Sequence, residues 1–91
     1  MLPILWRPEA ENDLAAILEF IAERNLQSAL DLLEDIRGVV SQLPHHPYLY
    51  RLGRVPGTRE LVAHPNYIVV YRVTATAIEI AAVVHARQQY P

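Results

Sequence analysis

The sequence has 91 residues, no cysteine and a formal net charge of −2. This length suits a single hydrophobic core, so we predict one domain over residues 1–91, without disulfides or thiolate chemistry. The N-terminus lacks the basic region of a signal peptide, and no apolar run approaches the length that spans a membrane. We therefore expect a cytoplasmic protein that does not insert into membranes.

Charge is divided unevenly along the chain. Residues 1–50 carry three arginines and eight carboxylates, a balance of −5, whereas residues 51–91 carry five arginines and two glutamates, a balance of +3. Arginine is the only cation, because the sequence contains no lysine. Two interpretations follow: a basic face that binds an anionic segment of a partner, or helices that simply carry glutamate and strands that carry arginine.

The first half of the chain predicts a strand and two helices. Residues 2–6 form a short apolar run, and Pro3 within it favours an edge position or a late start of the strand. A helical period of apolar residues follows over residues 8–24, with a proline and acidic residues in its first turn. A second apolar stripe at helical spacing ends before Pro44. The brief connection at residues 25–27 makes the two helices an antiparallel hairpin.

The second half predicts an ordered loop and a sheet. Residues 44–56 contain three prolines together with tyrosines and leucines that can be buried, which is typical of an ordered loop. Three runs rich in valine, isoleucine and tyrosine follow at residues 59–63, 67–73 and 77–86. Their three-residue connections are too short for crossover helices, so the runs form an antiparallel meander.

We therefore predict an α+β fold in the order strand–helix–helix–strand–strand–strand. The helical hairpin packs on one face of a small, mainly antiparallel sheet. The opposite face lacks the polar alternation of a solvated sheet, because residues 67–73 are apolar at nearly every position. Since 52% of the chain is hydrophobic, we expect another protein chain to cover that face.

The polar side chains offer little catalytic chemistry. The four histidines match no metal-binding spacing, so we predict neither a metal nor a cofactor. Nucleophilic catalysis is unsupported, since both serines fall on the second predicted helix and cysteine is absent.

General acid–base chemistry has one group of candidates, at the ends and middle of the predicted strands. They are Glu60, Arg72, His85, Arg87 and Tyr90. The simpler interpretation is that Arg72 with Glu79, or Arg59 with Glu60, are ordinary charges on a sheet surface. The polar residues 85–91 form either a frayed end or a recognition tail.

Several segments match one family of proteins in their order and spacing. They are PEAENDLAAILEFIAERN in the first helix, PHHPYLYRLGRVPGTREL in the loop, and PNYIVVYRV and IEIAAVVHARQQYP in the meander. Together they cover essentially the whole chain. They resemble the ParE/RelE superfamily of small bacterial toxins, and its ParE branch in particular.

The resemblance implies a toxin of a type II toxin–antitoxin module with the predicted fold. Members are held inactive by a cognate antitoxin, whose largely disordered C-terminal region folds onto the toxin. Operator DNA would then be bound only through the antitoxin. The ParE branch is associated with poisoning of DNA gyrase, whereas the RelE branch cleaves mRNA on the ribosome.

The end of the chain favours the ParE branch. RelE-like enzymes use several basic residues, commonly lysines with arginines, and a C-terminal tyrosine or histidine. Here lysine is absent, and Ile68 stands where many RelE-like chains carry an arginine. The ending HARQQYP is similar to the ParE ending. We therefore expect a gyrase poison rather than an enzyme; the alternative is a ribosome-dependent mRNA endoribonuclease that uses His85, Arg87 and Tyr90.

Two further sets of residues complete the predicted site. We expect contact with the target, or with phosphate in the nuclease alternative, from Arg59, Arg72 and Arg87. We expect contact with the antitoxin from Leu61, Ile68, Val70 and Arg72. A decayed member that only binds its antitoxin is a third alternative.

Overall fold

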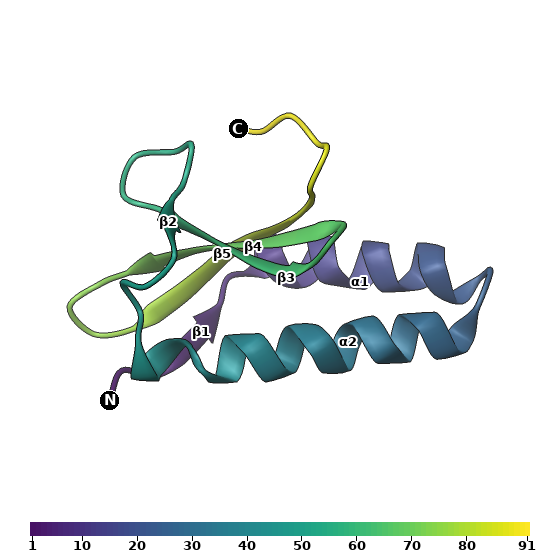
Figure 1. The fold of residues 1–91 in the computed structure, drawn as a ribbon, viewed down its shortest axis with the longest axis horizontal. Helices are drawn as coiled ribbons and strands as arrows, with labels where there is room; N and C mark the ends of the chain where they lie inside the picture. Colours follow the sequence, from purple (N-terminus) through teal and green to yellow (C-terminus); the bar gives the residue numbers. More distant parts are fainter.

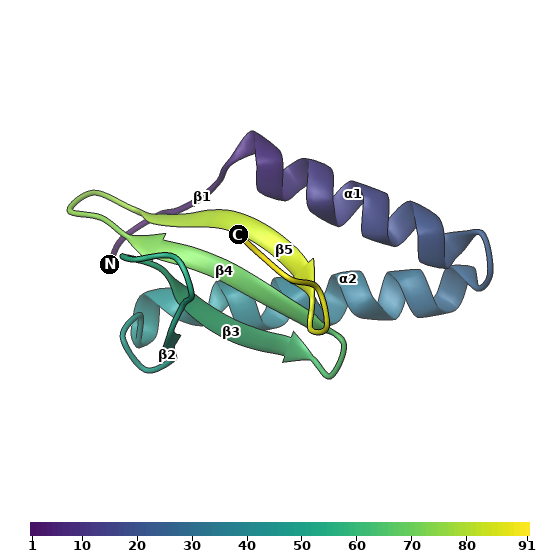
Figure 2. The same cartoon turned by 90° about the horizontal axis from the view of Figure 1, so that it is seen from above.

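The computed structural model describes residues 1–91, with two helices packed against one face of a five-stranded sheet (Figures 1 and 2). The strands lie in the order β1-β5-β4-β3-β2. The elements are β1 (Ile4–Trp6), α1 (Pro8–Ala22), α2 (Leu26–Ser41), the 3-10 turn η1 (Leu43–His45), β2 (Arg51–Leu52), β3 (Arg59–His64), β4 (Tyr67–Val73) and β5 (Ile78–His85). The predicted α+β fold is confirmed, and the two-residue β2 is an addition within the predicted loop.

Pairing between strands fixes the sheet. β3, β4 and β5 form the predicted antiparallel meander, and β2 adds to it as an antiparallel edge. The opposite edge is β1, which pairs in parallel with β5 in a register that places Ile4 beside Ile78. The parallel pair is possible because α1 and α2 provide a long connection. Pro3 precedes this edge strand, as the sequence predicts.

The helices begin and end at local signals in the sequence. α1 begins at Pro8, directly after the extended Arg7, and carries acidic residues in its first turn. Asn25 caps α2, because its side-chain oxygen accepts a hydrogen bond of 3.1 Å from the Ser28 N–H. α2 ends at Ser41, short of the predicted boundary, because Pro44 lies within the 3-10 turn that follows.

The main core lies between the helices and the facing side of the sheet. Helix side chains from α1 and α2 meet alternate residues of β3, β4 and β5 there. Tyr71, Ile36, Leu43, Ile78 and Ile80 are fully buried. At about 1.5 to 3 kcal/mol for each large apolar side chain removed from water, this layer provides most of the stability of so small a chain.

The other face of the sheet is covered by the protein's own C-terminal end. A second, smaller cluster contains Ile68, Val70 and Val84, and Ala86 and Tyr90 pack against it. The apolar character of this face is therefore explained in part by the chain's own tail, and contact with another chain there stays a prediction. The chain turns back after β5, where the Ala86 N–H donates a 2.7 Å hydrogen bond to the carbonyl of residue 66, and the tyrosine ring replaces solvent.

The helical hairpin extends past the sheet, so its far end projects beyond the strands (Figures 1 and 2). Helices of 15 and 16 residues are about 23 and 24 Å long, no longer than the eight-residue β5, so the hairpin projects because it is offset along the strands. Phe20, Leu26 and Leu30 on this far end are exposed to solvent. Neither helix has the length and apolar character needed to cross a membrane.

Candidate functional site

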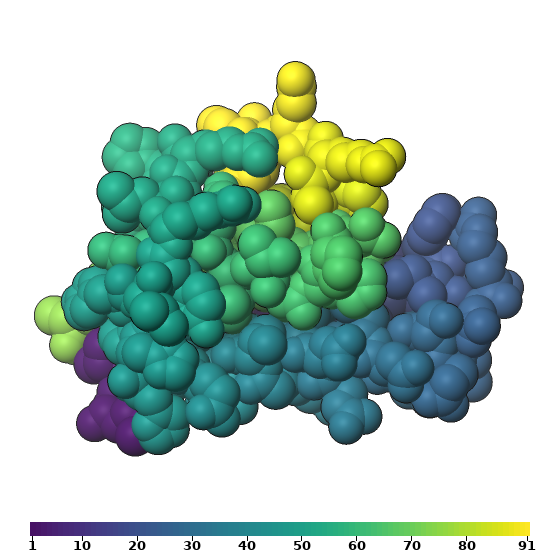
Figure 3. All heavy atoms as spheres, in the orientation of Figure 1, coloured from purple at the N-terminus to yellow at the C-terminus, as the bar shows by residue number.

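Two segments stand on the face of the sheet that points away from the helices (Figure 1). One is the second half of the loop of residues 48–54, which contains β2 and which we call the 48–54 loop; its first half lies at the sheet edge, beside Arg59 and Tyr71. The other is the C-terminal tail, residues 86–91, which runs back over the sheet (Figure 2). Both rise above the sheet in the space-filling view (Figure 3). They touch, because Arg54 Nη1 donates a 3.2 Å hydrogen bond to the Gln88 carbonyl.

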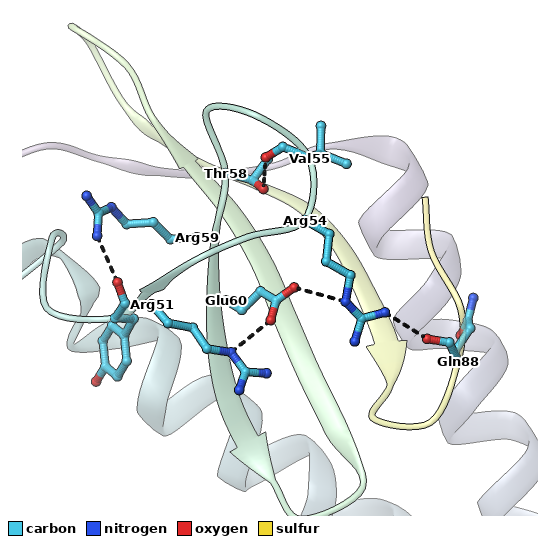
Figure 4. Close-up of polar contacts among 8 residues, drawn as sticks. Arg51, Arg54, Val55, Thr58, Arg59, Glu60 and Gln88 are labelled. Atoms are coloured by element: carbon cyan, nitrogen blue, oxygen red, sulfur yellow. Dashed lines mark hydrogen bonds and ion pairs between the residues drawn. The ribbon is translucent and has the colours of Figure 1, made fainter.

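A buried carboxylate joins these segments to the sheet. Glu60 on β3 is only 4% exposed, and its Oε1 accepts a 2.8 Å hydrogen bond from Arg51 Nε (Figure 4). Its Oε2 lies 3.9 Å from Arg54 Nε, an ion pair that leaves this oxygen without a hydrogen bond. The same Arg54 guanidinium lies 4.5 Å from the centre of the Tyr90 ring. One glutamate therefore holds two arginines, and one of these holds the tail.

The backbone of the 48–54 loop is fixed from its inner side. Arg59 Nη1 donates hydrogen bonds to the carbonyls of Tyr48, at 3.2 Å, and Tyr50, at 2.8 Å. The hydroxyl of the buried Tyr71 donates a 2.6 Å hydrogen bond to the Pro47 carbonyl just before the loop. The Tyr50 ring packs edge-on against the Tyr71 ring. The loop is therefore an ordered structure, as predicted.

Burial changes the acidity of the tyrosine beneath this loop. Removal of its ring from water raises the pKa of Tyr71 to about 12. The neighbouring Arg59 opposes the rise, and Tyr50 adds to it. The hydroxyl therefore keeps its proton, and its hydrogen bond to Pro47, at every physiological pH.

The C-terminal end of the loop is held by a close approach between the backbones of Gly53 and Thr58. The Gly53 N–H donates a 2.7 Å hydrogen bond to the Thr58 carbonyl, and the Thr58 hydroxyl donates one of 2.6 Å to the Val55 carbonyl. A Cβ at position 53 would collide with the Thr58 hydroxyl and lie 3.2 Å from its carbonyl carbon. Only glycine allows this approach.

A groove lies between α1 and the end of β5, and Gln88 of the tail also lines it. It encloses about 310 Å³, and its lining includes the apolar Ile17 and Phe20. Asp13 joins α1 to β5 at one end of the groove, since its Oδ2 accepts a 3.0 Å hydrogen bond from the Val83 N–H. This part of β5 is no longer paired with β1. Tyr67 and His85 close the groove on the strand side.

The three residues of the nuclease alternative do not converge. His85 lies on the helix-facing side with its ring 5.3 Å from that of Tyr67, and its Nδ1 accepts a hydrogen bond from the Arg87 N–H. Tyr90 packs on the opposite face against Ile68 and its neighbours. Arg87 is exposed in the tail between them. The imidazole and the phenol of this set therefore lie on opposite faces of the sheet.

The three arginines predicted to contact a target are also separated. Arg59 faces the same side of the sheet as Tyr71, its partner across the strands, and is committed to backbone carbonyls. Arg72 faces the other side, with its guanidinium beside Gly57. Arg87 is in the tail. They do not form one cationic patch.

The residues predicted to bind an antitoxin lie on two faces. Leu61 is 3% exposed in the core beneath the helices, whereas Ile68 and Val70 are equally buried beneath the tail. Arg72 is half-buried on the tail side. Contact with Ile68 or Val70 therefore requires displacement of the tail, and their role stays a prediction.

Sequence reasoning missed the arginines of the loop. Arg51 and Arg54 lie in a stretch without a regular period, so no pattern indicated that they share a carboxylate with β3. The available signal was composition: residues 44–59 contain three arginines and no acidic residue. No group of three or more histidine, aspartate or glutamate side chains is placed to hold a metal ion.

Sequence comparison relates the chain to known toxins. A family model described as the ParE toxin of the type II toxin–antitoxin system parDE matches residues 4–90. The toxin candidate Y4kP of Sinorhizobium fredii is 36% identical over 89 residues, which cover 97% of this chain and 92% of that protein.

Solved structures share the fold. A structure of the chromosomal ParDE toxin–antitoxin system from P. aeruginosa is 26% identical with a TM-score of 0.84, and the match covers 93% of this chain and 96% of that one. The YoeB dimer from Staphylococcus aureus matches 98% of both chains with a TM-score of 0.65. At 16% identity, the second likeness concerns the fold alone.

Proposed function

The chain belongs to the ParE toxin family of type II toxin–antitoxin systems, and on this premise we propose that it inhibits growth by poisoning DNA gyrase. We also propose that direct binding of a cognate antitoxin neutralises it. The toxin identity rests on the family match over residues 4–90. The choice of gyrase over the ribosome rests on the geometry of the charged groups.

The observation that carries this choice is the absence of a convergent set of catalytic groups. Cleavage of RNA requires an acid or base and free cations aimed at one phosphate. Here His85 and Tyr90 lie on opposite faces of the sheet, and Arg51 and Arg54 are paired with Glu60. A protein that acts by binding needs no such convergence, so these groups favour an inhibitory binding protein.

The groove between α1 and β5 is our candidate site for the antitoxin. A concave surface with an apolar floor compensates a disordered segment for the entropy it loses on folding. Phe20 and Ile17 provide that floor, and Asp13 and Gln88 offer polar partners at its rim. The P. aeruginosa relative was solved as part of a ParDE toxin–antitoxin system, which supports this partner class.

A supercoiling assay tests the target. Purified toxin is added to gyrase and relaxed plasmid, and the products are examined for lost supercoiling and for trapped, cleaved DNA. We expect both effects, and we expect the cognate antitoxin to relieve them. The control is the toxin mixed with antitoxin before gyrase is added.

Growth arrest without any effect on gyrase would contradict the proposal. The next measurement would then be mRNA cleavage on ribosomes, with His85→Ala/Arg87→Ala as the test variant. If this variant stays folded and still arrests growth, the nuclease alternative centred on these residues is excluded as well.

A further inference from the structure

We infer that the 48–54 loop is the surface with which this toxin grips its target, and that the target meets it with an acidic, concave protein surface. The inference rests on the proposed function and names the contact that such a function needs. It follows from three properties of the loop: exposure, rigidity and charge.

The loop exposes large apolar side chains in a short stretch. Tyr48 is 65% exposed, Leu49 is 69% exposed and Leu52 is 74% exposed. Single exposed leucines are ordinary on a soluble protein, but three large apolar residues within five positions form a patch. Tyrosine and arginine, which flank these leucines, are the residue types that dominate binding energy at protein interfaces.

These side chains project from a backbone that is already fixed. Arg59 binds two carbonyls of the loop, Tyr71 binds the carbonyl before it, and Gly53 closes it against Thr58. A loop ordered before binding loses little conformational entropy when the partner arrives. These hydrogen bonds order the backbone although the leucines themselves stay exposed. Such a loop is suited to present the leucines to a partner.

The charge of the loop selects an acidic partner. Arg51, Arg54 and Arg59 are the only charged residues between positions 44 and 59, and the nearest carboxylate, Glu60, is buried. The side chains of Arg51 and Arg54 remain 57% and 45% exposed while they bind it. A partner approaching the loop therefore meets exposed arginine and apolar side chains, with Arg51 on the Glu60 side of β2 and Leu52 on the Arg59 side, and carboxylates beside apolar groups would complement them.

The shape of the loop distinguishes a folded target from a disordered antitoxin. The ridge that rises above the sheet, away from the helices, is the connection from β2 to β3, which begins at the end of the 48–54 loop (Figures 1 and 3). A disordered segment gains most from a groove, and the groove between α1 and β5 is lined chiefly by helix-facing residues, with Gln88 of the tail as its link to the loop. A rigid ridge instead suits insertion into a concavity that the partner already has.

The test compares two double variants with the same chemical change. Leu49→Asp/Leu52→Asp removes the apolar centre and adds charges that repel an acidic partner. Leu26→Asp/Leu30→Asp is the control, at exposed positions of the hairpin with 63% and 49% exposure. Three readouts are collected for each protein: inhibition of gyrase supercoiling, growth arrest on expression in bacteria, and affinity for the cognate antitoxin.

We expect the loop variant to inhibit supercoiling at least about tenfold less, with growth arrest lost in parallel, because two interface leucines together contribute at least about tenfold even in modest contacts. Its antitoxin affinity should match that of the wild type, which also shows that it is folded. The hairpin variant should inhibit gyrase as the wild type does. Binding of the wild type to gyrase should weaken several-fold between about 50 and 200 mM NaCl.

Other outcomes overturn the inference. Wild-type potency in the loop variant would exclude the loop as the target surface. A selective loss of antitoxin binding would assign the loop to the antitoxin, and affinity for gyrase independent of salt would exclude an acidic partner. If the wild type arrests growth without inhibiting gyrase, the proposed target fails, and growth arrest by the two variants then decides the role of the loop.

Discussion

The 48–54 loop and the far end of the helical hairpin both expose large apolar side chains, but they hold them in different ways. The hairpin end is held by the hydrogen bonds of its own two helices, and its surroundings are acidic. The loop has almost no regular structure and is held by side chains that reach it from the sheet, chiefly Arg59, Glu60 and Tyr71. Its surroundings are basic.

This difference shows where each surface derives its order. Helical order is local, so the hairpin end keeps its shape wherever α1 and α2 are intact. The shape of the loop depends on residues distant in sequence, so a change within the sheet can alter a surface that it never touches. Four experiments with substitutions or a change of pH test this difference, and they follow in order of decreasing expected effect.

Substitutions in the part of the hairpin beneath the sheet should destabilise the protein far more than substitutions at its projecting end. Ile36→Ala empties a fully buried site where α2 lies beneath the sheet, and should lower the free energy of unfolding by about 2 to 5 kcal/mol. Leu30→Ala, at a half-exposed site on the projecting end, should cost less than about 1 kcal/mol. Urea unfolding followed by circular dichroism measures both; equal losses would show that the projecting end is part of the core.

Alkaline pH should weaken the support beneath the loop. Because the pKa of Tyr71 is raised to about 12 in the folded protein, unfolded chains release this proton first as pH rises. Stability should be constant below about pH 10 and fall by roughly 2 to 3 kcal/mol between about pH 10 and pH 12. Urea unfolding across this range tests the effect. Tyr71→Phe has no such proton and should show a shallower fall; an unchanged slope would assign the effect to other groups.

Replacement of glycine by alanine should have opposite effects on stability at two positions. Gly53→Ala forces the loop away from Thr58 and should cost about 1 to 3 kcal/mol. Gly38→Ala in α2 meets no atom within 4 Å and should stabilise the protein by about 0.5 to 1 kcal/mol. Thermal unfolding distinguishes the signs. If Gly53→Ala were neutral, the loop would be less constrained than its hydrogen bonds indicate.

The smallest effect concerns the tip of the hairpin. Asn25→Ala removes the cap of α2 and should cost about 1 kcal/mol. Faster amide exchange should be confined to the first turn of α2, while the amides of the 48–54 loop stay unchanged. Asn25→Ser keeps a capping oxygen and should recover most of the loss. Faster exchange in the loop would show that the two regions are coupled.

The sequence predicted those parts of the fold that depend on local periodicity. The helices and the strands β3, β4 and β5 were placed to within a few residues, because their apolar residues recur at intervals of 3.6 or 2. The same residues, with the ending HARQQYP, also carried the resemblance to ParE toxins, which the family match confirms.

Contacts between distant segments could not be predicted. Glu60 meets Arg51 and Arg54 only after β2 adds to the sheet, and no periodic pattern records that pairing. Tyr90 covers Ile68 because the chain reverses after β5, whereas composition allowed a frayed end or a recognition tail equally. The candidate residues were therefore chosen by type, and the structure separates them onto two faces.

The parallel pairing of β1 with β5 has a consequence for the moment at which the toxin becomes active. β1 pairs only with β5, so the sheet stays incomplete until β5 has left the ribosome. The tail that meets Arg54 is made later still. A half-made or prematurely truncated product therefore lacks both an edge of its sheet and its final covering. The order of synthesis thus delays the complete sheet until β5 has been made.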